Sequence, residues 1–235
     1  PPLFLARWKR HEKWVMRMDG ILPLYKPTGC TSHDMVAWAR RTLGVKKIGH
    51  AGTLDPSVSG VLPLCVGKAT RLLEYMHQWP KEYEGEMILG ISTDTLDGEG
   101  RVTEEKAVQA VDVSEVTAAF QTFIGEIEQV PPRYSAIKVK GKKLYQYARE
   151  NVEVDVPKRR VRIHALRLLG MARQGKTVAI QFAVTCSTGT YIRSLCRDIG
   201  QRLGYPAYMS RLERIRSGPF TLRDCWLQEQ VEKAV

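Results

Sequence analysis

The chain has 235 residues, of which 43% are hydrophobic and 26% charged, and its formal net charge is +11. This composition is typical of a globular protein with one large domain or two small ones, and no apolar run is long enough to span a membrane. The positive charge favours a polyanionic partner, nucleic acid or an acidic membrane surface, although a basic enzyme without such a partner would have the same composition.

The five cysteines are Cys30, Cys65, Cys186, Cys196 and Cys225. Their number is odd and no C-x-x-C pair occurs, so the sequence indicates neither a disulfide framework nor a thiolate zinc site. Cys65 and Cys186 lie in apolar runs and are expected to be buried. Free thiols fit the reducing cytoplasm, which is the expected location.

Regular patterning begins at Asp19, directly after Met18. The apolar stretch before it is too short for a secretory signal, and basic residues follow that stretch. We therefore expect residues 1–17 to be an extension of unknown role and residues 18–235 to form the folded domain.

Hydrophobic periodicity predicts the first elements in chain order. Residues 31–44 form a helix, because Thr31 or Ser32 can cap its start, an apolar face recurs at helical spacing, and Gly44 can end it. A short buried strand and a helix over 69–76 follow. Alternation over 83–91 predicts a strand, and residues 93–101 are a turn cluster.

In the second half, an amphipathic helix is predicted over 112–127, opened by a capping box of Asp112 and Glu115. A basic, tyrosine-rich stretch then occupies about 130–155. Strands are predicted over 159–169 and 178–186, and a last helix over 189–204. The elements lack a regular βαβ alternation, so the predicted fold class is α+β.

The stretch GHAGTLDPSVSG, residues 49–60, has the glycines of a ligand-binding loop but no lysine or arginine. It does not match the phosphate-binding pattern G-x-x-x-x-G-K-[ST]. The five histidines lack metal-ligand spacing, and no G-x-S-x-G elbow occurs, although a Ser–His–Asp triad built from distant residues stays open. By itself, Asp55 would be a turn aspartate that bonds its own backbone ahead of Pro56.

Six segments, the first of which contains this loop, change this interpretation. They are GHAGTLDPSVSGVLPL, DGILPLYKPTGCTSHDMV, KEYEGEMILGISTDTLDGEG, VPPRYSAIKVKGKKLYQYAR, CSTGTYIRSLCRDIG and SRLERIRSGPF. Together they resemble the TruB family of pseudouridine synthases, which convert a uridine in the T-loop of tRNA to pseudouridine. The resemblance extends over roughly residues 18–222.

The resemblance implies a mixed, largely antiparallel central sheet flanked by helices, with an RNA-clasping insertion at about 130–155. The implied activity is isomerisation of uridine 55 of tRNA, by base flipping, aspartate-dependent cleavage of the glycosidic bond and formation of a carbon–carbon bond. Because this reaction is redox-neutral, no cofactor and no metal is expected. Asp55 would act at the sugar and base, Arg193 would pair with Asp55, and Tyr83 would stack on the uracil and assist removal of its C5 proton.

Other family positions fall on residues that would hold the substrate. His50 would lie near the displaced base, Tyr191 would be a second pocket tyrosine, and Leu212 would be an apolar wall. Aromatic stacking and phosphate contacts would offset the cost of flipping the base. The cations expected to contact the RNA are Lys26, Arg71, Lys140, Lys142 and Lys143.

Bacterial members of the family usually continue into a small C-terminal RNA-binding domain, which we expect to be absent or truncated here. We expect tRNA as the partner, no membrane, no obligatory protein partner and a monomer. Two alternatives stay open. One is a tRNA-folding chaperone in which binding is the main role, and the other is a guide-RNA-dependent pseudouridine synthase, which carries a longer accessory domain and needs partner proteins.

Overall fold

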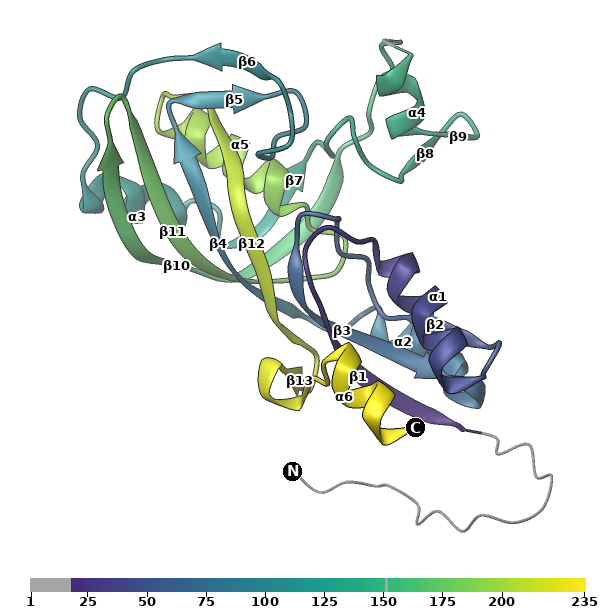
Figure 1. Cartoon of the computed structure of the whole chain (residues 1–235). Helices are drawn as coiled ribbons and strands as arrows, with labels where there is room; N and C mark the ends of the chain where they lie inside the picture. The colour runs from purple at the N-terminus through teal and green to yellow at the C-terminus, as the bar shows by residue number, and fades with distance from the viewer. Residues whose placement is uncertain (1–17, 151) are drawn as a thin grey trace, which may run out of the picture. The chain divides into compact units, whose positions relative to one another are not determined.

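The computed structural model describes residues 18–150 and 152–235. The chain divides into two compact units: the first combines the chain up to His77 with Arg216–Val235, and the second is Gln78–Ile215. Figure 1 shows the elements of both units, coloured along the chain. The extension expected over residues 1–17 lies outside the described residues.

The first unit is built on a small antiparallel sheet. β1 (Gly20–Lys26) and β2 (Ile48–His50) both pair with β3 (Ser59–Val66), which is buried along nearly its whole length. Helix α1 (Ser32–Leu43) packs on β2. The other elements of this unit are the 3₁₀ turns η1 (Gly67–Leu72) and η2 (Leu222–Asp224), α2 (Leu73–Met76), β13 (Phe220–Thr221) and α6 (Gln228–Ala234).

Helix α1 forms where the sequence predicts it. Thr31 and Asp34 make a reciprocal capping box, which satisfies amides that the first turn leaves without partners. Gly44 ends the helix in the left-handed conformation, with a φ of 64°. The predicted apolar face is buried, except that Leu43 is half-buried.

The second unit is built on a larger sheet in the order β12 (Ala207–Ser217), β4 (Lys81–Leu89), β11 (Thr177–Cys186), β10 (Arg159–Gln174) and β7 (Gly125–Gln129). The pairs β4–β11, β11–β10 and β10–β7 are antiparallel. Helix α3 (Val113–Gln121) packs on β10, and α5 (Ile192–Arg202) contacts α3, so that both helices lie behind the sheet in Figure 1. The second unit also contains two small hairpins and a helix. The hairpins are β5 (Ile91–Thr93) with β6 (Val102–Glu105) and β8 (Lys138–Val139) with β9 (Lys142–Lys143), and the helix is α4 (Leu144–Arg149).

The fold class predicted from the sequence is confirmed: antiparallel sheets are flanked by helices, and the expected strands over 159–169 and 178–186 form the hairpin of β10 and β11. Cys65 and Cys186 are buried free thiols, as expected. No helix within the described residues is long and apolar enough to cross a membrane.

The helix predicted over 112–127 is wrong in its second half. α3 opens with the expected capping box of Asp112 and Glu115 but ends at Gln121, and residues from Gly125 onward form β7. Gly125 has a φ of +105°, which is incompatible with a helix and redirects the chain into the strand.

Among the strands that were not predicted, β1 and β12 are long ones, and each was missed for a physical reason. β1 contains Pro23, and a proline argues against a strand interior. In β12 the buried positions change phase between Met209 and Leu212, and a further inward position is Arg214, with an exposed fraction of 1%. A buried arginine breaks the apolar alternation from which strands are predicted.

The first prediction concerns Gly200 in α5. Alanine normally favours a helix interior over glycine by about 1 kcal/mol. Here, however, a Cβ at position 200 would overlap the Cβ of Ala207 and lie 2.8 Å from the carbonyl oxygen of Tyr205. We expect Gly200→Ala to lower the free energy of unfolding by about 1–3 kcal/mol in urea denaturation.

Gly20→Ala is the matched control, because no atom lies within 4 Å of a Cβ built there. Its stability should stay within about 0.5 kcal/mol of the wild type. Equal stabilities for the Gly200 and Gly20 variants would contradict the close packing of α5 against residues 205–207.

Candidate functional site

In the first unit, the two neighbours of Asp55 are each held by the segment at residues 26–32. The Leu54 amide donates to the Ser32 hydroxyl at 2.8 Å, and that hydroxyl donates to the Leu54 carbonyl at 3.1 Å. On the other side, the Gly29 amide donates to the Pro56 carbonyl at 2.9 Å. These bonds fix the backbone on both sides of Asp55, whose side chain is half-buried.

Lys26 also holds this loop through hydrogen bonds of its ammonium group. Its side chain is fully buried, and its ammonium donates to the carbonyls of Pro27 at 2.8 Å, Cys30 at 2.7 Å and Pro56 at 3.4 Å. In this conformation Lys26 therefore supports the loop through its ammonium. An RNA contact by Lys26 stays a prediction.

The glycines of the loop are needed for its shape. Gly52 and Gly60 have φ values of +99° and +111°, which other residues rarely adopt. The Val58 amide donates to the Asp55 carbonyl at 3.0 Å and closes a tight turn after the aspartate. His50, at the end of β2, is half-buried, and Arg71 is exposed in η1. An RNA contact by either residue stays a prediction.

The second prediction follows from the buried ammonium. Lys26→Met removes the ammonium donor from three carbonyl groups, of which Pro56 keeps the Gly29 amide, and we expect a loss of about 1–3 kcal/mol in the free energy of unfolding. RNA affinity should keep its salt dependence, because no phosphate contact is removed. Lys46→Met, at an exposed position of the same unit, is the stability control. If the RNA affinity of Lys26→Met depended less on salt concentration than that of the wild type, Lys26 would be a phosphate contact after all.

In the second unit, Tyr83 is the third residue of β4, opposite Val184 of β11, and is half-buried. Two residues further on, Gly85 leaves space for Leu212: a Cβ at Gly85 would lie 2.8 Å from the Leu212 Cδ1 atom. Leu212 is buried. The structure thus brings Leu212 to the side of β4 that carries Tyr83, where an apolar pocket wall was expected, and its contact with substrate stays a prediction.

Arg193 is held by a loop to which the sequence assigned only a turn. Its guanidinium donates to the carbonyls of Thr95 at 3.0 Å and Tyr134 at 3.1 Å, and lies 3.4 Å from a carboxylate oxygen of Asp97. Both charged side chains are less than a tenth exposed. Asp97 is itself oriented by the Thr95 hydroxyl at 2.6 Å and the Glu99 amide at 3.1 Å.

Asp97 is the site residue that sequence reasoning missed. Its only signal was its place in the turn TDTLDGEG, since periodicity cannot distinguish a buried carboxylate from a solvated turn residue. Arg193 and Asp55 belong to different units, so their expected ion pair stays a prediction.

The start of α5 is anchored through its backbone. The side-chain amide of Gln129 accepts from the Tyr191 amide at 3.0 Å and donates to the Tyr191 carbonyl at 3.3 Å. The Ser194 hydroxyl donates to the Val130 carbonyl at 2.9 Å. These bonds fix the positions from which Tyr191 and Arg193 project. Tyr191 is half-buried, and its expected contact with the base stays a prediction.

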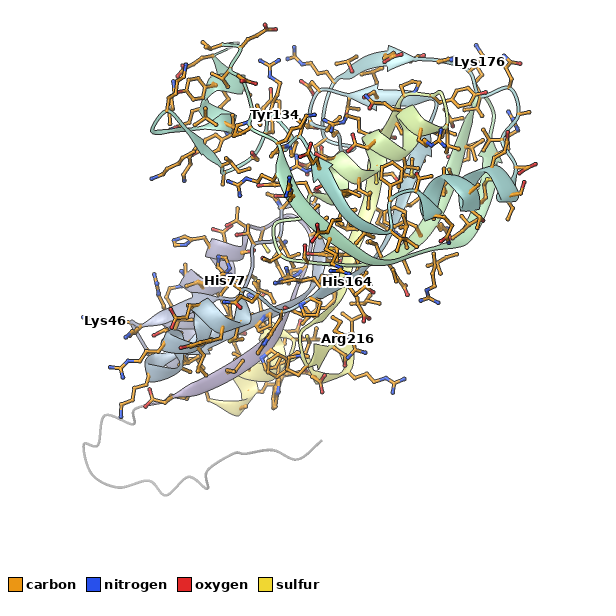
Figure 2. The ribbon with its side chains drawn as sticks, turned by 180° about the vertical axis from the view of Figure 1, so that it is seen from behind. Lys46, His77, Tyr134, His164, Lys176 and Arg216 are labelled. Atoms are coloured by element: carbon orange, nitrogen blue, oxygen red, sulfur yellow. The ribbon has the colours of Figure 1, made fainter. Side chains whose placement is uncertain are left out.

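The segment between β7 and β10 forms a small substructure of its own, with β8, β9 and α4. Figure 2 labels Tyr134, close to where this substructure joins the body of the second unit. Lys140 is exposed, whereas Lys142 and Lys143 are half-buried, with their ammonium groups over the rings of Tyr147 and Tyr145. Lys142 also pairs with Glu150. The three lysines expected to contact phosphate are therefore not equally available.

Lys81 is a buried cation on β4, with an exposed fraction of 4%. Its ammonium donates to the Trp79 carbonyl at 2.6 Å. Burial, together with the nearby positive charge of Arg214, lowers the pKa of Lys81 from 10.5 to about 8. Among residues 18–150 and 152–235, no cluster of three His, Cys, Asp or Glu side chains could hold a metal ion.

The third prediction uses the lowered pKa of Lys81. Because the folded pKa of Lys81 lies below the unfolded one, the unfolded chain binds more protons between pH 8 and 10.5, so this group makes the fold more stable as pH rises through that window. Lys81→Met removes the effect. Between pH 7 and 9.5, the free energy of unfolding of the wild type should gain about 2 kcal/mol relative to the variant. Parallel pH profiles would mean that Lys81 is not desolvated in the folded state.

The chain is similar to known proteins in both sequence and fold. A family model described as TruB family pseudouridylate synthase (N terminal domain) matches residues 40–192, and one described as tRNA pseudouridylate synthase B C-terminal domain matches residues 193–235. Proteins named tRNA pseudouridine synthase B are 55% identical over 222 residues in Geobacillus thermodenitrificans and 48% identical over 217 residues in Bacillus subtilis. Each alignment covers 92% of this chain, and they cover 72% and 70% of the relatives.

Solved structures are also similar. A chain of the "Crystal Structure of a Cbf5-Nop10-Gar1 Complex" superposes with a TM-score of 0.70 at 33% identity, over 91% of this chain and 54% of that chain. A chain of the "Structure of H/ACA RNP bound to a substrate RNA containing 2'-deoxyuridine" gives a TM-score of 0.66 at 31% identity, over 91% and 52%. The present chain thus spans about half the length of these structural neighbours.

Proposed function

Since this chain belongs to the TruB family of pseudouridylate synthases, we propose that it isomerises the uridine at position 55 in the T-loop of tRNA to pseudouridine. The observation that carries the proposal is the clamped loop of the first unit. Hydrogen bonds from residues 26–32 hold both neighbours of Asp55, while the carboxylate itself is half-buried. A catalytic carboxylate needs this kind of rigid support.

The proposed reaction breaks the bond between C1′ and N1 of the uridine, turns the uracil and joins C1′ to C5. The proton on C5 then leaves, its C–H electron pair restores the double bond between C5 and C6, and N1 takes up a proton. Asp55 acts at the reacting sugar and base, Tyr83 stacks on the flipped uracil, and Arg193 pairs with Asp55. No electrons are gained or lost, so the proposal includes no cofactor.

Binding of the RNA rests on the exposed cations of the second unit. The substructure between β7 and β10 presents Arg133, Lys138, Lys140 and Arg149 to solvent. Their phosphate contacts, together with stacking on the flipped base, offset the cost of flipping, which is a few kcal/mol. We propose that Lys142 and Lys143 contribute to the same surface, with Arg71 of the first unit as a further contact.

We also propose that the chain works in the cytoplasm as a monomer, with tRNA and without an obligatory protein partner. Relatives at about half identity are named as tRNA enzymes, whereas the neighbour from a three-protein complex is 33% identical. This difference favours the tRNA enzyme over a guide-RNA-dependent synthase. Because Asp55, Tyr83 and Arg193 are all present, catalysis is favoured over a purely chaperone role.

The fourth prediction tests the function itself. The wild-type protein, incubated with unmodified tRNA in EDTA, should convert uridine 55, and chemical mapping of pseudouridine locates the product. Asp55→Asn should lower the single-turnover rate at least a thousandfold, because the amide cannot act as a carboxylate, while tRNA affinity stays within about threefold.

Glu229→Gln makes the same change of carboxylate to amide at an exposed position of the first unit and should be fully active. Product at another uridine would contradict the assigned target. An Asp55→Asn enzyme within tenfold of the wild type would remove Asp55 from the mechanism.

The fifth prediction concerns the phosphate contacts. Each lost contact should flatten the slope of log affinity against log salt concentration by about 0.7–0.9. Lys140→Ala should weaken tRNA binding and flatten the slope by the amount expected for one contact. The Lys140, Lys142, Lys143 triple alanine variant should show larger changes in both, whereas its single-turnover rate at saturating tRNA should be much less affected. Lys233→Ala, on α6, is the control. A slope that the triple variant does not change would place the RNA contacts elsewhere.

A further inference from the structure

Two buried cations lie on the face of the second sheet that carries Tyr83. Lys81 precedes Tyr83 by two residues on β4, and side chains two apart on a strand project from the same face, about 7 Å apart. Arg214 comes from β12, two residues beyond Leu212, which packs on Gly85 of that face. The exposed fractions of Lys81 and Arg214 are 4% and 1%.

The two charges are close enough to influence each other and their neighbours. The charge of Arg214 lowers the pKa of Lys81, and both cations act on the Cys186 thiol, which faces Lys81 across the β4–β11 ladder. The glutamates of β4, at positions 82, 84 and 86, alternate with Lys81 and Tyr83 and therefore project from the opposite face. The titratable neighbours of Tyr83 on its own face thus include Lys81, Arg214 and Cys186.

Burying two like charges side by side is expensive, and methionine or leucine would fill the same volume without that cost. The ammonium of Lys81 is held by the Trp79 carbonyl, so its position is defined. With a pKa of about 8, it is still mostly charged at pH 7. A positive potential maintained beside a catalytic tyrosine has a direct chemical use, because it stabilises negative charge on the phenol oxygen.

Resting on the function proposed above, we propose that Lys81 and Arg214 are positioning residues for Tyr83. Their charges favour the phenolate form of its side chain, which accepts the proton that leaves C5 of the uracil. In this step the C5–H bond breaks, its electron pair becomes the C5=C6 bond, and the phenolate becomes a phenol that returns the proton to solvent. Neither cation touches the substrate; both act through Tyr83.

The test is single-turnover kinetics at pH 7, with unlabelled tRNA and with tRNA carrying deuterium at C5 of uridine. Lys81→Met removes the charge and should slow the reaction about 10- to 100-fold with tRNA affinity unchanged. Lys81→Gln, which can still donate to the Trp79 carbonyl, is a second neutral variant with the same expected loss. Lys81→Arg restores the charge and should recover most of the rate. Lys158→Met, at an exposed position of the same unit, should match the wild type.

The isotope effect distinguishes this role from a structural one. If the lost charge slows removal of the C5 proton, both neutral variants should show a primary deuterium isotope effect of about twofold or more. A slow variant without an isotope effect overturns the proposal, as does a Lys81→Arg variant that is as slow as Lys81→Met, or neutral variants as fast as the wild type. A wild-type protein that forms no pseudouridine in tRNA would instead refute the proposed function.

Discussion

The hydrogen bonds of the Lys26 ammonium are the interaction on which the loop of the first unit depends. This ammonium lies at the end of β1, fully buried, and gathers carbonyls from its own segment and from the loop that follows β2. A backbone turn exposes carbonyl groups that must find donors, and one cation satisfies several of them at once. Ser32 does the same for Leu54 at the start of α1. The conformation of the Asp55 loop is therefore determined by side chains that lie far from it in the sequence.

In the second unit, buried charged side chains likewise bind groups that lie far from them in the sequence. Arg193 is enclosed by two carbonyls and the Asp97 carboxylate. Lys81, on the same strand as Tyr83, and Arg214, on the neighbouring strand β12, are also buried. Buried charges are rigid because every displacement costs hydrogen bonds in a region of low dielectric constant. These side chains explain why α5 and β12 contain polar residues at inward positions. They also connect the turn at 93–101 with the helix that begins a hundred residues later.

Local patterns predicted the elements in which burial and polarity coincide. α1, β10, β11 and α5 follow apolar periodicity, and each lies close to its expected range. The prediction failed where a local residue type did not match the structure around it. The buried Arg214 interrupted the apolar pattern of β12, Pro23 argued against a strand at β1, and Gly125 ended α3 earlier than predicted. For the site, motifs predicted Asp55, Tyr83 and Arg193, but nothing in the sequence distinguished a buried lysine such as Lys26 from an exposed one such as Lys140. That distinction depends on burial, which only the three-dimensional fold determines.

The substructure between β7 and β10 begins and ends at paired positions, because Gln129 lies opposite Arg159 in the antiparallel ladder. Its two ends are thus held together by the sheet, whatever the length of chain between them, and loop-closure entropy changes only slowly with that length. Natural variation can therefore lengthen, shorten or replace this segment without disturbing the sheet. The constraint is its first few residues, since the carbonyls of Val130 and Tyr134 bind α5. A lineage could exchange the remainder as a cassette and acquire a different RNA while keeping the same catalytic core.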